Sequence, residues 1–140
     1  MAAILVLNEE TKDQTIVVGA TDTVSGVKTI ATYSNQAGVM KDRYLMANGD
    51  SGWNVENSTN TGADVEGTSF AAPRIAGAAA IVKSKFPSLS GANVADILLL
   101  TADKDINDDG TDDFSSTSSV YGRGELDLAS ALSPVGNLVP

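Results

Sequence analysis

Histidine and cysteine are both absent from this sequence of 140 residues. Without cysteine, the chain can form no disulfide, offers no thiolate nucleophile and cannot hold a cysteine-ligated zinc ion. Without histidine, it has no imidazole to act as a general base, although imidazole is the base that most often activates a serine nucleophile. A reaction that needs such a base must therefore obtain it from residues outside this sequence.

Basic residues and long apolar runs are also scarce. Nine Lys and Arg residues stand against eighteen Asp and Glu residues, and the net charge of −9 at pH 7 would repel a phosphate backbone, so nucleic acid is not an expected partner. No apolar run approaches the roughly 18–20 residues that span a bilayer. The apolar start, Met1–Leu7, lacks basic residues and is soon followed by Glu9 and Glu10, so we interpret it as a strand and not as a signal peptide.

The order of apolar and polar residues predicts a single α/β domain. At 140 residues and 42% hydrophobic content, the chain is long enough for one buried core and too short for two ordinary domains. Strands are expected where β-branched or alternating runs end in turn residues, and helices where apolar residues recur every three or four positions. The expected strands are Thr15–Ala20, Val27–Tyr33 and Arg43–Ala47. The expected helices are Ser69–Lys85, Gly91–Ala102 (capped by Ser90) and a short amphipathic piece, Glu125–Leu132. The segment Asp50–Glu66 is expected to be a long loop.

Ser69 lies at the expected start of the longest helix, within Gly67–Pro73. A helix N-terminus offers unpaired backbone N–H groups and a positive dipole end, and both stabilise the oxyanion that forms when a serine attacks a carbonyl. The small neighbouring residues would let a substrate approach closely. The alternative is that Thr68 or Ser69 only caps the helix, which is a common use of hydroxyl residues at such positions. Spacing alone leaves both interpretations open.

Several further segments, in order along the chain, favour the interpretation of Ser69 as a nucleophile over that of a helix cap. Together with Gly67–Pro73, they resemble blocks of the subtilisin-like (subtilase, S8) serine peptidases. The resemblance is strongest to autotransporter-type members, in which the peptidase passes into a C-terminal extension. The segments are IVVGATD (16–22), IATYSNQAG (30–38), YLMANG (44–49), LLLTA (98–102), YGRGELD (121–127) and ALSPVG (131–136).

The resemblance implies a subtilisin-like three-layer α/β fold with a mostly parallel sheet, present only as its C-terminal portion. Residues 1–132 would belong to the peptidase domain, and residues 133–140 would begin a linker or C-terminal extension. The implied activity is hydrolysis of peptide bonds through an acyl-enzyme on Ser69, whose own backbone N–H would form half of the oxyanion hole. The family's catalytic Asp and His and its oxyanion-hole Asn cannot be placed. Asn8 follows Leu7 and not Gly, so we do not assign it.

The implied partners are a polypeptide substrate and the missing N-terminal half of the domain. No cofactor would be required for catalysis, and the chain alone is expected to be inactive. By resemblance, the protein would be secreted or displayed at the surface of a bacterium. Two residues depart from the family pattern: Arg74 stands where many members have a second, non-catalytic His, and Asn48 replaces the usual Pro of a turn.

The acidic segment Asp105–Asp113 is a candidate calcium loop. Oxygen-bearing side chains occur at loop positions 1, 3, 5 and 9 (Asp105, Asn107, Asp109 and Asp113), and Gly110 occupies position 6. Position 12 is Ser116, where an EF-hand needs a bidentate carboxylate. The alternative is a solvated acidic surface loop.

A non-catalytic role is the main alternative to a peptidase. The chain would then be a pseudoenzyme fragment or a calcium-stabilised binding module. Tyr44 lies shortly before the expected long loop and Trp53 lies within it. An aromatic residue there could line a substrate subsite, although local packing would also explain both.

Overall fold

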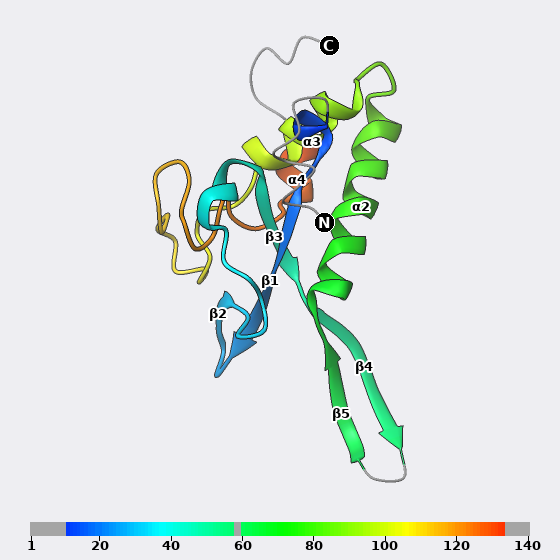
Figure 1. The fold of residues 1–140 in the computed structure, drawn as a ribbon, viewed down its shortest axis with the longest axis vertical. Coiled ribbons are helices and arrows are strands. Elements are labelled where there is room, and N and C mark those ends of the chain that lie inside the picture. The colour runs from blue at the N-terminus through cyan, green and yellow to red at the C-terminus, as the bar shows by residue number, and fades with distance from the viewer. Residues whose placement is uncertain (1–10, 58–59, 134–140) are drawn as a thin grey trace.

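The computed structural model describes residues 11–57 and 60–133, and for residues 53–57 and 60–64 it describes the backbone alone. The strand predicted at Met1–Leu7 and all but the first residue of the predicted linker lie outside the described residues. Along the chain, a strand-rich first part is followed by a long β-hairpin and then by a helical second part (Figure 1).

A three-stranded sheet in the order β2-β1-β3 forms the centre of the fold. Strands β1 (Val17–Val24) and β3 (Tyr44–Asn48) are parallel, with Val17 opposite Tyr44 and Thr21 opposite Asn48. Strand β2 (Val27–Ile30) returns antiparallel to the far end of β1. The strands predicted at Thr15–Ala20, Val27–Tyr33 and Arg43–Ala47 are present, although β2 ends three residues early, at Ile30. Strand β1 continues past Ala20, where it was expected to end, because Ser25 and Gly26, both at positive φ, suffice for a tight hairpin turn.

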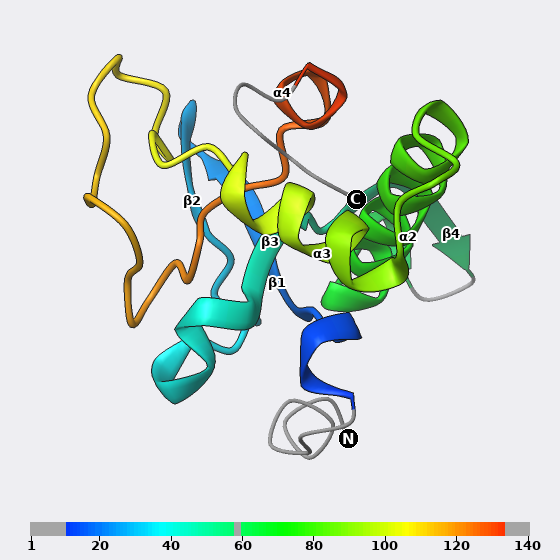
Figure 2. The same cartoon turned by 90° about the horizontal axis from the view of Figure 1, so that it is seen from above.

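Side chains of the two parallel strands alternate between two apolar clusters, as the two-residue period of a strand requires. Leu45 and Ala47 face a large cluster made with helices α2 (Thr68–Lys85), α3 (Gly91–Leu100) and α4 (Leu128–Leu132). Tyr44 and Met46 face a smaller cluster completed by the loop that follows α3. The helices therefore cover one face of the sheet, and in the described residues a loop covers the other (Figures 1 and 2).

The segment predicted as a long loop is instead a β-hairpin. Strands β4 (Asp50–Asn57) and β5 (Asn60–Glu66) pair antiparallel, with Asp50 opposite Glu66, and they extend away from the sheet (Figure 1). The prediction was wrong because it rested on the Gly, Asn, Ser and Thr content, whereas backbone pairing in an antiparallel hairpin requires no apolar pattern. Two short 3₁₀ helices complete the fold: η1 (Lys12–Gln14) precedes β1, and η2 (Gly38–Arg43) precedes β3.

Helices α2 and α3 agree with the prediction to within two residues, whereas α4 begins three residues later than predicted, and the caps explain where α3 and α4 start. Ser90 Oγ accepts a hydrogen bond of 3.1 Å from the Asn93 N–H at the start of α3, as expected. Asp127 caps α4 in the same way, so this helix begins at Leu128. Helix α2 buries Ala71, Ile75, Ala78 and Val82 along one side.

Pro73 is the sixth residue of α2, and not within the first four. From the sequence, Pro73 is expected about one turn into the helix, where its missing N–H would have had no helical partner anyway; its observed position shows that this expectation is wrong. An N–H at this position would have bonded to the Ser69 carbonyl oxygen. Pro73 therefore leaves the Ser69 carbonyl oxygen without the N–H donor that a helix would normally supply.

Candidate active site

Ser69 is the second residue of α2 and is exposed to solvent. The residue that caps the helix is Gly67, which has no side chain to contribute. Thr68 and Ser69 therefore both lie inside the helix, and the alternative interpretation of either as the cap is wrong. No hydrogen bond joins the Ser69 hydroxyl to another residue within the described part of the chain. The hydroxyl thus remains available to a ligand.

Ser69 opens onto a cleft of about 500 Å³. Thr68, Ser69 and Ala72 form its α2 side, Ile16–Val18 form its β1 side, and Asn35 contributes from the loop after β2. The lining of the cleft is thus apolar except for the hydroxyl groups of Thr68 and Ser69 and the side-chain amide of Asn35. Because the first N–H groups of a helix have no partner within it, the N–H of Ser69 and the positive end of α2 also lie at this position.

Two backbone hydrogen bonds tie the start of α2 to the sheet. The Gly67 N–H donates to the Gly49 carbonyl oxygen at 2.9 Å, and the Gly49 N–H donates to the Thr21 carbonyl oxygen at 3.1 Å. The hydroxyl of Tyr33 lies against Gly49, so close that an added Cβ atom would be 2.2 Å from it. Ser69 is therefore carried on a turn whose position is set by the ends of β1 and β3.

The surroundings of this turn are acidic. Burial, followed by the negative charges of Glu66, Asp22 and Asp50, raises the pKa of Tyr33, while the Gly67 N–H opposes the shift. Arg74 lies on α2 and donates a hydrogen bond of 2.6 Å from Nη2 to the Asp50 carbonyl oxygen. The residue that replaces a second histidine in the family pattern therefore attaches α2 to the base of the β4–β5 hairpin.

Two other residues that the sequence singled out, Tyr44 and Asn48, form hydrogen bonds that hold the fold. Tyr44 is buried, and its hydroxyl donates a hydrogen bond to the Asn35 carbonyl oxygen, so Tyr44 does not line a substrate subsite. Asn48 Oδ1 accepts a hydrogen bond of 2.7 Å from the Asp50 N–H, which closes the turn where the family pattern has Pro. The Trp53 side chain lies outside the described residues.

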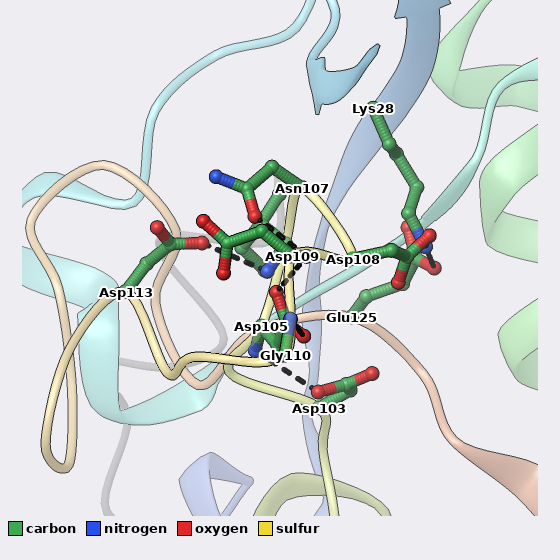
Figure 3. Close-up of polar contacts among 10 residues, drawn as sticks. Lys28, Asp103, Asp105, Asn107, Asp108, Asp109, Gly110, Asp113 and Glu125 are labelled. Atoms are coloured by element: carbon green, nitrogen blue, oxygen red, sulfur yellow. Dashed lines mark hydrogen bonds and ion pairs between the residues drawn. The ribbon is translucent and has the colours of Figure 1, made fainter. Parts of the chain in front are cut away.

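The four candidate calcium ligands organise their own loop (Figure 3). Asp105 accepts hydrogen bonds from the N–H groups of Asp109 at 3.0 Å and Gly110 at 2.8 Å. Asn107 accepts from Asp109, Asp109 accepts from Thr111, and Asp113 accepts from Ile106. Within the part of the chain that the structure describes, no group of three or more acidic side chains is arranged to hold a metal ion. Calcium binding at this loop stays a prediction.

An ion-pair group beside this loop escaped the sequence analysis. Lys28 Nζ lies 2.9 Å from Glu125 Oε1 and 3.0 Å from Asp108 Oδ2, and so joins β2 to the loop and to the segment before α4 (Figure 3). Desolvation is the largest effect on Lys28 and lowers its pKa, but hydrogen bonds and charges from Glu125 and Asp108 together raise it above the usual value. Lys28 and Glu125 are 97 positions apart, so no local pattern pairs them.

Comparison with known proteins identifies the family. The family model described as the subtilase family, Peptidase S8, matches residues 5–124. The chain belongs to the subtilase family. Subtilisin DY of Bacillus licheniformis is 34% identical over 119 residues, which cover 85% of this chain and 37% of that protein. Serotype-specific antigen 1 of Mannheimia haemolytica is 34% identical over 109 residues, which cover 74% of this chain and 11% of that protein.

Solved structures agree on the fold. Fervidolysin from Fervidobacterium pennivorans, described as a keratinolytic enzyme related to subtilisin, superposes with a TM-score of 0.63 at 25% identity, covering 90% of this chain and 20% of that one. MycP1 superposes with a TM-score of 0.62 at 23% identity, covering 90% of this chain and 38% of that one. The subtilisin-like fold expected from the sequence is therefore confirmed. The chain spans well under half the length of these relatives.

Proposed function

We propose that Ser69 is the nucleophile of a serine endopeptidase. The observation that carries this proposal is the position of Ser69: exposed, second in α2, free of a capping role and open to a cleft of about 500 Å³. The family assignment supplies the reaction class, and the substrate is then a polypeptide.

In this reaction, Ser69 Oγ attacks the carbonyl carbon of the scissile peptide while a base takes the hydroxyl proton. The carbonyl oxygen becomes an oxyanion, which the Ser69 N–H and the positive end of α2 stabilise. Collapse of the intermediate breaks the C–N bond, the proton passes to the departing amine, and water then hydrolyses the acyl-enzyme. Pro73 keeps the Ser69 carbonyl out of a helical hydrogen bond, which leaves this first turn less constrained.

The base and its orienting carboxylate come, in this proposal, from polypeptide outside the 140 residues, because the sequence has no histidine. The N-terminal part of a subtilase domain is the partner that would contribute them. This chain alone is then inactive. The name of one relative, a serotype-specific antigen, supports export to the cell surface or medium. Among the described residues, no helix is long and apolar enough to cross a membrane.

Two experiments test the proposal. A fluorophosphonate probe should label the isolated chain no faster than it labels the Ser69→Ala variant, because no base activates the hydroxyl. A chimera in which this chain replaces the matching part of subtilisin DY should hydrolyse casein, should lose that activity with Ser69→Ala, and should keep it with Ser84→Ala, an exposed serine of the same helix. Labelling of the isolated chain at an enzyme-like rate, or a chimera indifferent to Ser69→Ala, would contradict the proposal.

A further inference from the structure

Asn48 and Gly49 form the one Asn-Gly pair in the sequence, and this pair lies where β3 ends and β4 begins (Figure 1). An Asn-Gly pair can cyclise without an enzyme, when the backbone nitrogen of the glycine attacks the side-chain carbonyl carbon of the asparagine. Glycine favours this reaction because it has no side chain to hinder the approach and leaves the backbone free to turn. Position 48 is also where the family pattern has Pro, so this chain has a reactive amide that the pattern lacks.

The electrophile of this reaction, the side-chain carbonyl of Asn48, is accessible and polarised. The Asn48 side chain is exposed, and its Oδ1 accepts a hydrogen bond of 2.7 Å from the Asp50 N–H. This bond from residue 50 back to residue 48 holds the side-chain carbonyl beside the intervening peptide. A donor on a carbonyl oxygen also stabilises the negative charge that develops there when a nucleophile adds to the carbon.

The nucleophile, the backbone nitrogen of Gly49, is held back by the fold. Its N–H donates to the Thr21 carbonyl oxygen at 3.1 Å, and the Gly49 carbonyl oxygen accepts from the Gly67 N–H at 2.9 Å. Gly49 is buried, and the Tyr33 hydroxyl oxygen lies 2.2 Å from the position that a Cβ atom would take there. To attack, the nitrogen must leave Thr21 and lose its proton. The reaction therefore requires the end of β3 to open away from β1.

We propose that Asn48 is a deamidation site that reacts when the end of β3 opens. Hydroxide takes the proton of the Gly49 nitrogen, which forms a bond to Asn48 Cγ. The bond from Cγ to Nδ2 then breaks, and the departing nitrogen takes up a proton and leaves as ammonia, so that a succinimide ring remains. Water adds to one of the two ring carbonyl carbons and breaks its bond to the ring nitrogen. The product is aspartate or isoaspartate at position 48.

The isoaspartate product would displace the turn that carries Ser69. In isoaspartate the main chain runs through the side-chain methylene group, so the path from residue 48 to Gly49 becomes longer. The packing around Gly49 leaves no room for the added length. Gly49 would then no longer meet both Thr21 and Gly67, and the start of α2 would lose its attachment to the sheet. The chemistry at Asn48 does not depend on whether Ser69 is catalytic.

Peptide mapping by mass spectrometry, on the full 140-residue chain incubated at mildly alkaline pH, measures the reaction. Asn48 should deamidate at least about tenfold more slowly in the folded chain than in concentrated urea. Arg74→Met removes the donor to the Asp50 carbonyl oxygen, and should speed the folded reaction by about threefold to tenfold without changing the rate in urea. Asn48→Pro should abolish the reaction. Asn35, which is exposed and precedes Gln36, is the internal control and should stay intact.

Hydrogen–deuterium exchange follows the consequence for the turn. The Gly67 amide should lose protection in step with the isoaspartate content, whereas the Met46 amide, which donates to the Gly124 carbonyl oxygen at 2.8 Å, should stay slow. Asp109 also precedes a glycine, but its isomerisation releases no ammonia, so the mass of each peptide separates the two sites.

Three results would contradict the proposal. Equal rates at Asn48 in the folded and unfolded chains would show that opening of β3 is not required. A folded rate that Arg74→Met leaves unchanged, or deamidation of Asn35 as fast as that of Asn48, would show that the local structure does not control the reaction. Chains that carry isoaspartate at position 48 and keep the Gly67 amide protected would show that the turn is not displaced.

Discussion

The Gly67 N–H donates a hydrogen bond of 2.9 Å to the Gly49 carbonyl oxygen, and through this contact the turn before Ser69 is attached to the end of β3. Gly49 in turn donates to Thr21 of β1. The position of the candidate nucleophile therefore depends on how closely these backbone segments approach one another. Glycine at position 49 permits that approach, because the Tyr33 hydroxyl occupies the space where a side chain would begin.

Gly49→Ala should destabilise the fold by about 1–3 kcal/mol, as overpacking of a tight site usually does. The added methyl group would lie 2.2 Å from the Tyr33 hydroxyl oxygen and 2.9 Å from Ala20 Cβ. Tyr33 can move, since it is partly exposed, but Ala20 is fully buried. Chemical denaturation measures the change.

The control is Gly77→Ala on α2, where an added Cβ meets nothing within 4 Å. That change should stabilise the protein by about 0.5–1 kcal/mol, because alanine is the better helix former. Equal effects at the two positions would show that space around Gly49 is not limiting.

Lys28→Met should cost about 1–2 kcal/mol of stability, because Glu125 would remain largely buried without its cation. The pKa of Lys28 is raised in the folded state, so its contribution is present in full below the unfolded value of about 10.4 and disappears as the pH rises through the higher folded value. The stability difference between the two proteins should therefore be constant from neutral pH to about pH 10 and shrink above it. Lys41→Met, at an exposed lysine, should have little effect. A stability difference between the parent and Lys28→Met that grows as the pH rises would contradict the raised pKa of Lys28.

The sequence predicted features whose causes are local. Helix α2 follows from apolar residues at helical spacing, and the start of α3 follows from the Ser90 cap. Ser69 could be located because its motif and its helix are contiguous. The β4–β5 hairpin could not be predicted, since its strands pair through backbone groups of polar residues such as Asp50 and Glu66. Contacts between distant segments, such as Lys28 with Glu125, leave no pattern along the chain.

Tyr44→Phe should destabilise the fold by about 1–2 kcal/mol, because the Asn35 carbonyl oxygen would lose the buried hydroxyl that donates to it. Burial also raises the pKa of Tyr44, with an opposing hydrogen bond from Ser34. A raised pKa means that the neutral phenol is favoured in the folded state, so this contribution falls as the pH rises above the unfolded value of about 10. Melting curves between pH 7 and 11 should show a shallower alkaline decline in the Phe variant. An identical decline in both proteins would show that folding does not raise the pKa of Tyr44.

Asp105→Ala should destabilise the acidic loop whether or not calcium is present. Asp105 accepts hydrogen bonds from two backbone amides, and their loss should cost about 1–2 kcal/mol. Asp112→Ala, on an exposed carboxylate of the same loop, is the matched control and should stay within about 0.5 kcal/mol of the parent.

A calcium-binding loop would also give a melting temperature that rises with calcium concentration, since a ligand bound only to the folded state stabilises it. A saturable increase at millimolar calcium that both Asp105→Ala and Asp109→Ala abolish would establish the calcium site. An unchanged melting temperature would instead show that Asp105–Asp113 is a solvated acidic surface loop.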